Sequence, residues 1–513
     1  MQDTITINPN DTVALAEVLR EDLPHQRWFR SKARTLRAGR IRDSIAIPGT
    51  DSRIILLDVE FQEGDVDTYA LTVTFAHGET PRGAKTIAGT LYDALWNGPF
   101  TDALLNAISR ERSFSGERGN LTTCHTSAFE RIAGTRHTRL TARVSKAEQS
   151  NSSVFYGDRF VLKLYRKLEP GINPDFEIGR FLTEQGFRHT PAVAGHIEYR
   201  GGTAAPTSLG ILQQYIPNQG DAWEYTLQSA SRFFDRALET GLEAPPLPGT
   251  EHPLELMGMR PPAETEDLIG NYLESACLLG LRTAQLHIAL SSGEGGPDFE
   301  PEPFTDDFRN KLHGRLIAQA DAAIRVVREK RDTLSRPIAQ DAQRLLDLEP
   351  RILEVFRRLC ENRIHAVRIR HHGDFHLGQV LYTGDDFVII DFEGEPARSL
   401  EERRMKRAAL RDVAGMIRSF QYAAYSALRK RQHVLSGGET WAAFWTAWVS
   451  RAFVAAYFGR ANGHPFLPDN EHERKLLFDV FLLEKALYEV AYELNNRPDW
   501  VGIPLRGVAA VMA

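Results

Sequence analysis

Hydrophobic and polar positions follow two different periods along the chain. Residues 54–76 contain two apolar runs on either side of an acidic turn with a glycine, a pattern typical of a β-hairpin. After this segment Leu91, Leu95 and Leu104 recur at helical spacing, which predicts a helix over residues 79–108. The start of the chain is therefore expected to combine strands with some helix.

β-Rich segments return between residues 126 and 216. Strands are predicted at residues 129–133, 139–144, 153–166 and 208–216. The third of these contains Gly157 followed by an aspartate, which indicates a tight turn between two strands. A helix is predicted to begin at Asn173 and to end near Gly186, because Asn is a good N-cap, Pro174 fits the first turn and acidic residues follow.

From residue 219 onward most of the hydrophobic spacing is helical. The clearest helices are predicted at residues 271–290, 308–327 and 474–495. The exception is residues 380–393, VLYTGDDFVIIDFE, which predict two short strands around a turn at Gly384.

This order of elements divides the chain into three parts. Residues 1–95 are expected to form a β-rich N-terminal cap subdomain, residues 96–217 a sheet with one helix, and residues 218–513 a helical unit with one embedded hairpin. The last two parts have the layout of the small N-lobe and the larger C-lobe of a kinase. The predicted fold class is therefore α+β, a bilobal eukaryotic-protein-kinase-like fold with an extra N-terminal cap and a mainly helical C-lobe.

Composition is that of an ordinary globular protein and excludes several functions. The 513 residues are 42% hydrophobic and 25% charged, with a net charge of −6 and a pI near 6.3. A negative total argues against a general nucleic-acid binder. The three cysteines lie far apart, which fits a reducing compartment, and we recognise no signal peptide and no membrane-spanning stretch. We therefore expect a cytoplasmic protein with no nucleic-acid or membrane partner.

The densest group of ionisable residues lies between His371 and Pro396, in HHGDFHLGQVLYTGDDFVIIDFEGEP. Asp374 is followed five residues later by Gln379, the separation of the Asp and Asn in a kinase catalytic loop. Asp391 begins Asp-Phe-Glu after the predicted hairpin, where protein kinases have Asp-Phe-Gly. Carboxylate and amide oxygens suit Mg²⁺. We expect Asp374 to accept the proton of the acceptor hydroxyl, while Gln379 and Asp391 hold the metal.

Other polar residues in this stretch have simpler interpretations. Asp385 and Asp386 follow a glycine and are typical of a turn. The three histidines lack the cysteines or the HExxH pattern of a zinc site. We expect His372 and His376 to brace the loop, or His376 to line the acceptor pocket.

A nucleotide-binding half is predicted upstream. Lys163 lies in a predicted strand and Glu177 on the following helix, 14 residues later, as in the lysine–glutamate pair that positions kinase phosphates. Asp175 is an alternative partner for the lysine. The polar turn before the strand, in AEQSNSSVFYGD, is a candidate phosphate-binding loop. Its candidate residues are Ser150, Asn151, Ser152 and Ser153.

The segment ILQQYIPNQG follows the last predicted strand of the small lobe, at the position of a kinase hinge. The backbone groups of Gln214 and Ile216 are candidates to form hydrogen bonds with the adenine ring there. Together with the acidic residues of the catalytic stretch, this predicts ATP and Mg²⁺ as cofactors.

Several of these segments resemble bacterial maltokinases, relatives of the aminoglycoside phosphotransferases with a protein-kinase-like fold. Residues 391–424, which begin DFEGEP, are similar to the signature region of that family, and residues 373–381 are similar to its catalytic loop. Residues 26–34 resemble the start of its N-terminal cap, residues 148–184 its phosphate-loop and lysine-strand region, and residues 482–505 its C-terminal helix. The resemblance covers nearly the whole chain.

The resemblance implies an ATP- and Mg²⁺-dependent phosphotransferase that converts maltose to maltose 1-phosphate for α-glucan and glycogen synthesis. The family is often fused behind trehalose synthase, which makes trehalose synthase a candidate protein partner. Two alternatives stay open. Close relatives phosphorylate glucosamine and share the DFEGEP region, and the third candidate is a non-catalytic sugar-binding partner of trehalose synthase. The non-catalytic alternative is disfavoured because the chain has the full set of predicted catalytic, metal and phosphate residues, Asp374, Gln379, Asp391 and Lys163.

Sugar contacts are predicted at two places. Glu393 and Glu395 follow Asp391 closely and suit sugar hydroxyls, although Glu393 also suits the metal. Lys485, Tyr488 and Tyr492 recur at i, i+3 and i+7 on one face of one helix, and in the resembling family this face contacts maltose.

Two further predictions concern the segment after DFEGEP. The charge run that contains Arg404, Lys406 and Arg407 predicts a solvated helix face. Asp412 lies in the apolar run LRDVAGMIRSF and is expected to be a buried brace for the catalytic loop.

Overall fold

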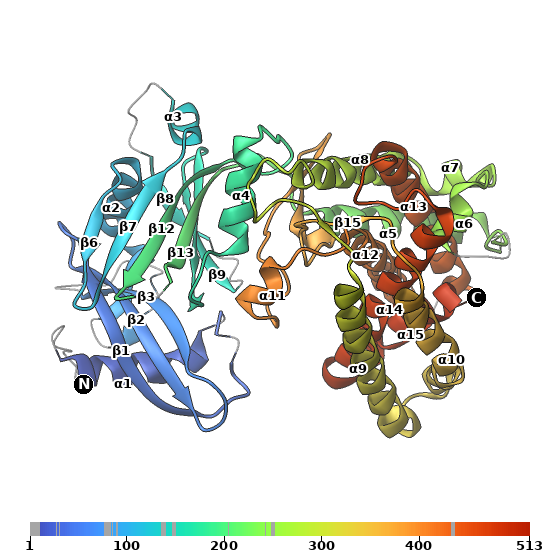
Figure 1. Ribbon diagram of the computed structural model, residues 1–513, viewed down its shortest axis with the longest axis horizontal. Coiled ribbons are helices and arrows are strands. Elements are labelled where there is room, and N and C mark those ends of the chain that lie inside the picture. Colours follow the sequence, from blue (N-terminus) through green and yellow to red (C-terminus); the bar gives the residue numbers. More distant parts are fainter. Residues whose placement is uncertain are drawn as a thin grey trace. The chain divides into compact units, whose positions relative to one another are not determined.

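The structure is a computed structural model that describes residues 11–512 except 27, 30, 76–83, 85, 89–90, 135–139, 146–149, 204, 242, 248–251, 432–434 and 436. Residues 147–149 of the candidate phosphate-binding loop lie outside the described residues. The chain divides into two compact units, Met1–Pro217 and Asn218–Ala513 (Figure 1).

The N-terminal unit contains two antiparallel sheets and a few helices. The strands of the first sheet are β1 (Leu36–Ala46), β2 (Ser52–Phe61), β3 (Asp67–Phe75), β4 (Thr86–Ala88), β5 (Leu91–Asp93) and β11 (Lys167–Leu168). The strands of the second are β6 (Ser113–Ser115), β7 (Gly119–His125), β8 (Ala142–Val144), β9 (Asn151–Tyr156), β10 (Phe160–Tyr165), β12 (Val193–Gly201) and β13 (Thr207–Gln214). The helices are α1 (Thr12–Asp22), η1 (Leu23–His25), η2 (Ala94–Trp96), α2 (Gly98–Ser109), α3 (Ala128–Ala133) and α4 (Pro174–Glu184).

The first sheet has the order β1-β2-β3-β5-β4, with β11 paired to β3, and it lies between two hydrophobic cores. Ile55 and Leu57 of β2 pack in one core with residues of α1, whereas Ile54 and Leu56 pack in the other core with residues of the second sheet. Successive side chains of a strand point to opposite faces, so the sheet is a layer between α1 and the second sheet. This is why β2 is apolar at consecutive positions.

The second sheet has the order β6-β7-β12-β13-β10-β9-β8. Its strands β9 and β10 form a hairpin that pairs Tyr156 with Phe160 around the turn at Gly157. Helix α4 begins after Asn173, whose side chain accepts a hydrogen bond from the backbone N–H of Asp175. The hairpin and the capped helix predicted from the sequence are both confirmed.

Asp43 of β1 joins the two sheets. Its carboxylate is fully buried and accepts hydrogen bonds from the backbone N–H groups of Glu117 at 2.7 Å and Arg118 at 3.2 Å. It also accepts one from the hydroxyl of Tyr199 on β12 at 2.8 Å. Glu117 and Arg118 form the turn between β6 and β7. One carboxylate of the first sheet therefore holds the β6–β7 hairpin of the second sheet.

The C-terminal unit is mainly helical. Its longer helices are α5 (Ala222–Thr240), α8 (Tyr272–Leu290), α9 (Asp306–Lys330), α10 (Arg336–Glu361), α12 (Leu410–Arg429), α13 (Gly438–Ala461), α14 (Glu471–Asn496) and α15 (Gly502–Met512). Its short helices are α6 (Pro253–Met257), α7 (Glu264–Ile269), η3 (Arg331–Thr333), η4 (Leu377–Gln379), α11 (Leu400–Arg404) and η5 (Pro498–Trp500). Its strands are β14 (Glu302–Pro303), β15 (Val367–Arg368), β16 (Val380–Tyr382) and β17 (Phe387–Ile389).

Helix α12 is central to this unit, because it packs against α5, α13, α14 and α15. The strands β16 and β17 pair antiparallel around the turn at Gly384, which confirms the hairpin predicted within the helical half. The helices predicted at residues 271–290, 308–327 and 474–495 correspond to α8, α9 and α14 and are also confirmed.

Two elements predicted in the first third of the chain are wrong. Residues 129–133 were expected as a strand but lie in α3, whose first turn contains Glu130 after Ser127 at the N-cap. Of the helix predicted over residues 79–108, residues 79–83, 85 and 89–90 lie outside the described residues. Among the described ones, α2 is helical, but Leu91 lies on β5 opposite Phe75 of β3. In both cases short apolar runs did not distinguish a strand from a helix.

The charge run after DFEGEP also differs from its prediction. Helix α11 ends at Arg404, and Lys406 and Arg407 are only 8% and 3% exposed. The Lys406 ammonium donates to the carbonyl oxygen of Pro297 at 2.6 Å and to the Glu302 carboxylate at 2.9 Å. The prediction of a solvated helix face is therefore wrong at these two residues, because the chain leaves the helix and turns inward.

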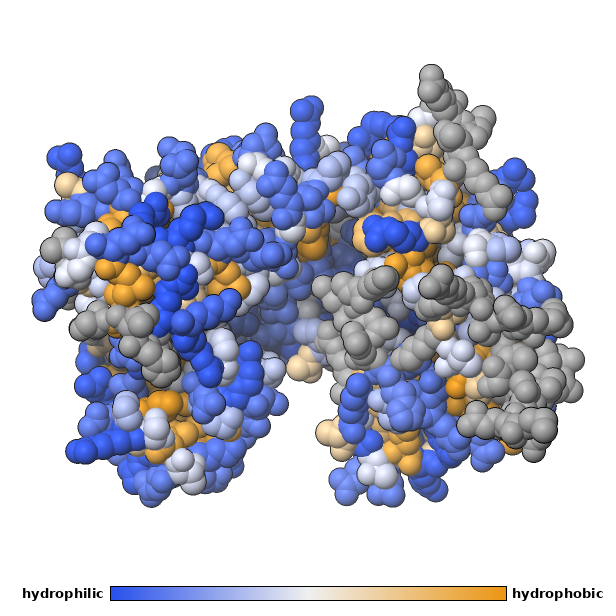
Figure 2. Space-filling view, turned by 180° about the vertical axis from the view of Figure 1, so that it is seen from behind, coloured by the Kyte–Doolittle hydropathy of each residue, from blue (hydrophilic) through white to orange (hydrophobic). Residues whose placement is uncertain are grey.

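The surface agrees with the composition. The face drawn in Figure 2 is largely hydrophilic, with small separate hydrophobic patches. Within the described ranges, none of the helices has the length and apolar character needed to cross a membrane.

Replacing Asp43 should destabilise the N-terminal unit. Asp43→Ala leaves buried backbone donors without an acceptor, so we expect a loss of about 3 kcal/mol in the free energy of unfolding. Hydrogen exchange of the β6–β7 amides measures this loss. The control is Glu60→Ala, at an exposed position of β2. Equal effects of the two substitutions would contradict the assigned role of Asp43.

Candidate active site

The loop that contains Asp374 is held by one buried carboxylate on α12. Asp412 is 2% exposed, and its two oxygens accept hydrogen bonds from the backbone N–H groups of His372 at 2.8 Å and Gly373 at 3.0 Å. The expected brace is therefore observed as direct hydrogen bonds to the residues that precede Asp374.

The Asp412 carboxylate has a further partner in His287 of α8. His287 Nε2 donates to Asp412 Oδ2 at 3.0 Å, and His287 Nδ1 accepts from the hydroxyl of Tyr457 on α13 at 2.9 Å. Burial alone would raise the pKa of Asp412, but His371 and the hydrogen bond from His287 outweigh burial and hold that pKa well below its usual range. A charged carboxylate is thus maintained inside the unit.

Two glycines allow the loop and α12 to make these contacts. Gly373 has a φ of 88°, a conformation that a side chain disfavours, and this places two successive N–H groups toward Asp412. A Cβ at Gly415 of α12 would lie 2.6 Å from the carbonyl oxygen of Phe375, so only glycine allows the helix this near to the loop.

The histidines of the catalytic stretch support the loop. His372 Nε2 donates to the carbonyl oxygen of Ile390 at 2.9 Å, which ties the loop to the end of the β16–β17 hairpin. His376 Nδ1 accepts from the backbone N–H of Gly378 at 3.1 Å and caps η4. Burial lowers the pKa of His376. His376 therefore has the bracing geometry, and it is not among the residues that line the pocket described below.

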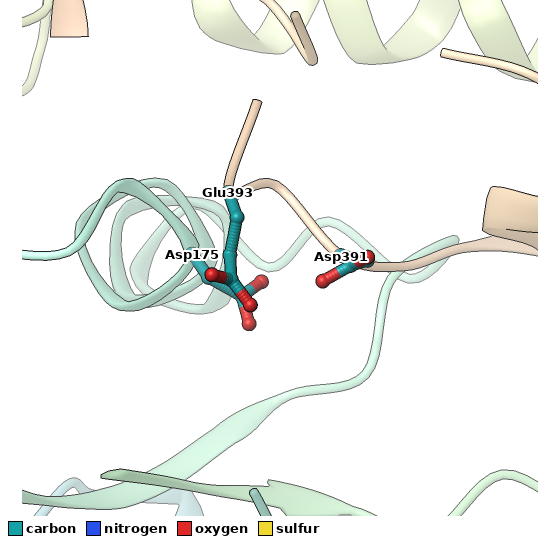
Figure 3. Close-up of side chains that lie close together, drawn as sticks. All are labelled: Asp175, Asp391 and Glu393. Atoms are coloured by element: carbon teal, nitrogen blue, oxygen red, sulfur yellow. The ribbon is translucent and has the colours of Figure 1, made fainter. Parts of the chain in front are cut away.

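Asp391 directly follows the hairpin in a strained conformation. Its φ of 69° lies in the left-handed region, which non-glycine residues rarely adopt. A carboxylate oxygen of Asp391 lies within 4.8 Å of one of Glu393, and both side chains are labelled in Figure 3. Gln379 is fixed on η4 by backbone hydrogen bonds to His376 and Ile390. Paired carboxylate oxygens of this kind fit a hard cation such as Mg²⁺.

A small pocket that is open to solvent lies at Asp374. It is polar, and its walls come from the loop that contains Asp374, the segment after Asp391, α9, α12 and α14. The lining residues are Gln319, Gly373, Asp374, Phe375, Glu395, Arg398, Arg411, Asp412, Gly415, Phe481, Glu484, Lys485 and Tyr488. Glu395 thus lies in the pocket, whereas Glu393 lies beside Asp391, the residue predicted to hold the metal.

Lys485 of α14 faces the carboxylate of Asp374. Its Nζ lies 3.9 Å from Asp374 Oδ1 and 3.8 Å from Glu395 Oε1. Burial by itself lowers the pKa of Lys485, but Asp374, Glu489 and Glu395 together raise it above the ordinary value. Burial raises the pKa of Glu395, yet Lys485 and Arg398 outweigh this effect and lower it. Both groups therefore stay charged.

An aromatic surface continues from the pocket along α14. Tyr488 and Tyr492 are 37% and 46% exposed, and their rings stack with centroids 6.4 Å apart and an interplanar angle of 21°. Lys485 Nζ lies 5.4 Å from the centre of the Tyr488 ring. Exposed large aromatic side chains are unusual in a packed helix, so this face is a candidate platform for a ligand.

The candidate nucleotide residues of the N-terminal unit meet at the start of α4. Lys163 of β10 donates to Asp175 Oδ2 at 3.1 Å, and Asp175 projects from the first turn of α4 (Figure 3). Asp175 and Glu177 are 1% and 5% exposed. The observed ion pair joins Lys163 to the alternative partner considered from the sequence.

Arg166 fixes the described part of the candidate phosphate-binding loop. Its Nε donates to Ser152 Oγ at 2.8 Å and its Nη2 to Asp93 Oδ2 at 2.8 Å. Asn151, Ser152 and Ser153 lie on β9, and Ser150 directly precedes this strand. Because Asp93 belongs to the first sheet, the guanidinium connects the cap with the loop.

The candidate hinge residues lie at the end of β13. The backbone N–H of Gln214 donates to the carbonyl oxygen of Ala192 at 2.8 Å, so this donor is not available to an adenine ring in this structure. Ile216 lies two residues later, just after the strand. The adenine-reading role of both residues stays a prediction.

Several pocket residues were not found from the sequence. Arg398, Arg411 and Glu484 are charged residues in ordinary-looking helical or loop segments, and only packing brings them to Asp374. One signal was available for Glu484, since it directly precedes Lys485 in the sequence.

Comparisons with known proteins identify similar sequences. Residues 23–104 match the maltokinase N-terminal cap domain. A glucosamine kinase from Streptacidiphilus jiangxiensis is 24% identical over 361 residues, 70% of each chain. A glucosamine kinase from Mycolicibacterium smegmatis (strain ATCC 700084 / mc(2)155) is 24% identical over 371 residues, 71% of this chain and 78% of the relative. The chain is thus similar in sequence to these kinases over about 70% of its length. The resemblance seen in the sequence is confirmed.

Solved structures show the same fold. A structure described as glucosamine kinase in complex with glucosamine, ADP and inorganic phosphate has a TM-score of 0.65 at 18% identity, covering 99% of this chain and 100% of that one. A second crystal structure of glucosamine kinase has a TM-score of 0.65 at 19% identity and covers 99% of both chains. The predicted α+β, kinase-like fold is therefore confirmed.

The stability of the C-terminal unit should depend on His371. Burial lowers the pKa of His371 to about 3, whereas an unfolded histidine titrates near 6.5. The unfolded state therefore binds the extra proton between these values, and stability falls as the pH falls through this window. His371→Gln should reduce the slope of the unfolding free energy against pH between about 4.5 and 6.

Urea titrations at several pH values measure this slope. The control is His472→Gln, at an exposed position of α14, which should keep the slope of the unchanged protein. Identical slopes in all three proteins would show that His371 is not neutral in the folded state.

Proposed function

We propose that this protein is an ATP-dependent kinase that phosphorylates a sugar, and that its preferred acceptor is maltose, converted to maltose 1-phosphate. The observation that carries the proposal is the pocket at Asp374. A carboxylate fixed by a buried brace lies in a polar cavity next to a lysine and a stacked pair of exposed tyrosines. This combination suits a polyhydroxylated acceptor with one reacting hydroxyl.

Asp374 is the proposed base on the acceptor side. As the acceptor oxygen bonds to the γ-phosphorus of ATP, its proton passes to the Asp374 carboxylate. The bond from that phosphorus to the bridging oxygen breaks, and ADP leaves with the bonding electrons. Lys485 and Glu395 would bind sugar hydroxyls, and Tyr488 and Tyr492 would pack against the apolar face of a sugar ring.

The nucleotide and metal roles follow from the residues on each unit. Lys163, oriented by Asp175 and close in sequence to Glu177, would bind donor phosphates, with Ser150 to Ser153 along the phosphate-binding loop. Asp391 and Gln379 would hold Mg²⁺, and the Asp391–Glu393 pair adds a further carboxylate. When bound, the ion neutralises charge on the phosphates.

Maltose is proposed over other sugars because of the cap and the tyrosine pair. The cap domain that residues 23–104 match takes its name from maltokinase, and the stacked tyrosines extend the pocket beyond one ring. Glucosamine is the second candidate acceptor, since the relatives named above are glucosamine kinases. A role in glycogen synthesis, with trehalose synthase as a partner, belongs to the maltose proposal.

A panel of acceptors tests the proposal. The protein is incubated with ATP, Mg²⁺ and maltose, glucose, glucosamine or trehalose, and ADP release is measured. We expect the fastest release with maltose. No turnover on any sugar would refute a sugar kinase, whereas a preference for glucosamine would refute the choice of maltose alone.

Asp374→Asn should lower kcat at least about 100-fold, because the amide cannot accept the hydroxyl proton. Thermal unfolding should be nearly unchanged, since the brace through Asp412 uses the backbone of His372 and Gly373. The matched control is Asp385→Asn in the exposed hairpin turn, which should keep normal turnover. A near-normal kcat for Asp374→Asn would remove its role as base.

Lys163→Met should raise the KM for ATP by about tenfold or more, because a charge-assisted contact to the phosphates is lost. The KM for the sugar should stay within about twofold, since Lys163 belongs to the nucleotide half. Lys167→Met, at a half-exposed lysine four residues later, is the control. Steady-state kinetics with each substrate varied separately measures both constants, and a selective rise in the sugar KM would contradict the assignment.

A further inference from the structure

The pocket at Asp374 has no uncompensated carboxylate among the residues that line it. Glu484 forms an ion pair with Arg411 at 2.9 Å. Glu395 pairs with Arg398, three residues later in the chain. The Asp412 carboxylate is occupied by the hydrogen bonds that brace the catalytic loop.

The remaining lining carboxylate is Asp374, and its partner is Lys485. The Lys485 ammonium lies between two acids, 3.9 Å from Asp374 Oδ1 and 3.8 Å from Glu395 Oε1. These side chains are 27%, 24% and 13% exposed, in the order lysine, aspartate and glutamate. The protein therefore carries its own fixed cation at the site where an acceptor with a positive charge would seek carboxylates.

We propose that Lys485 determines acceptor specificity, because its ammonium occupies the Asp374–Glu395 carboxylate pair and makes the pocket select neutral sugars against amino sugars. The inference rests on the proposed sugar kinase function and deepens it. An ammonium on the acceptor would meet a like charge in a half-buried setting and would lose its water shell without gaining a free carboxylate. A hydroxyl at the same carbon has no such cost, because it donates to a carboxylate while Lys485 stays in place.

Glucose and glucosamine separate this effect from shape, since they differ only in a hydroxyl or an ammonium at one carbon. The quantity to measure is kcat/KM for glucosamine divided by kcat/KM for glucose. In the unchanged protein we expect this ratio to be below one. In Lys485→Met, which keeps most of the length of the side chain and removes its charge, the ratio should rise by about tenfold or more.

Two control variants keep the interpretation specific. Lys485→Arg retains the positive charge, and Lys475→Met removes a partly exposed lysine elsewhere on α14, so neither should raise the ratio. If Lys485 had a merely structural role, its replacement would lower kcat/KM for both sugars together and leave the ratio unchanged. If a variant loses turnover, the ratio of the calorimetric affinities for the two sugars in the presence of ADP is measured instead and should change in the same direction.

The inference is overturned if the unchanged protein prefers glucosamine to glucose, or if the ratio in Lys485→Met stays the same or falls. Absence of turnover with every sugar of the panel, in the unchanged protein, contradicts the proposed function instead. The two failures are therefore distinguishable in one set of assays.

Discussion

The buried charge of Asp412 is the constraint on which the rest of the site depends. A carboxylate removed from water is costly unless its oxygens accept strong hydrogen bonds. Here the donors are the backbone N–H groups of His372 and Gly373 and the imidazole of His287. The same contacts that stabilise the charge therefore fix the backbone immediately before Asp374. Gly373 is required for its left-handed backbone conformation, and Gly415 is required because the helix and the loop approach each other closely.

With the loop fixed, the pocket depends on how α14 presents its charged and aromatic face. Lys485 and Tyr488 reach the cavity, and Tyr492 continues the surface outward by stacking on Tyr488. The lysine keeps its charge because nearby acids outweigh burial. Glu395 keeps its charge because Lys485 and Arg398 outweigh the effect of burial and lower its pKa. The cavity is thus highly charged yet nearly balanced, which suits an acceptor without a charge of its own.

Local signals in the sequence predicted much of this, and tertiary packing decided the rest. The N-cap at Asn173, the β16–β17 hairpin and the spacing of Asp374 and Gln379 are short-range features, so they were visible in the sequence. The α3 helix was mistaken for a strand although Ser127 and Glu130 have the spacing of a helix start. Arg398, Arg411 and Glu484 could not be assigned, because surface and buried arginines or glutamates have the same local pattern until the segment after Asp391, α12 and α14 pack together.

The central claim is that a γ-phosphoryl group is transferred to a sugar held at Asp374. Phosphorus NMR of the reaction products, correlated with the protons of the sugar, tests this most directly. The account predicts that incubation with ATP, Mg²⁺ and maltose gives a new phosphate signal coupled to the anomeric proton, together with an equal amount of ADP. Release of the γ-phosphate only as inorganic phosphate, or recovery of intact ATP with every sugar, would contradict it.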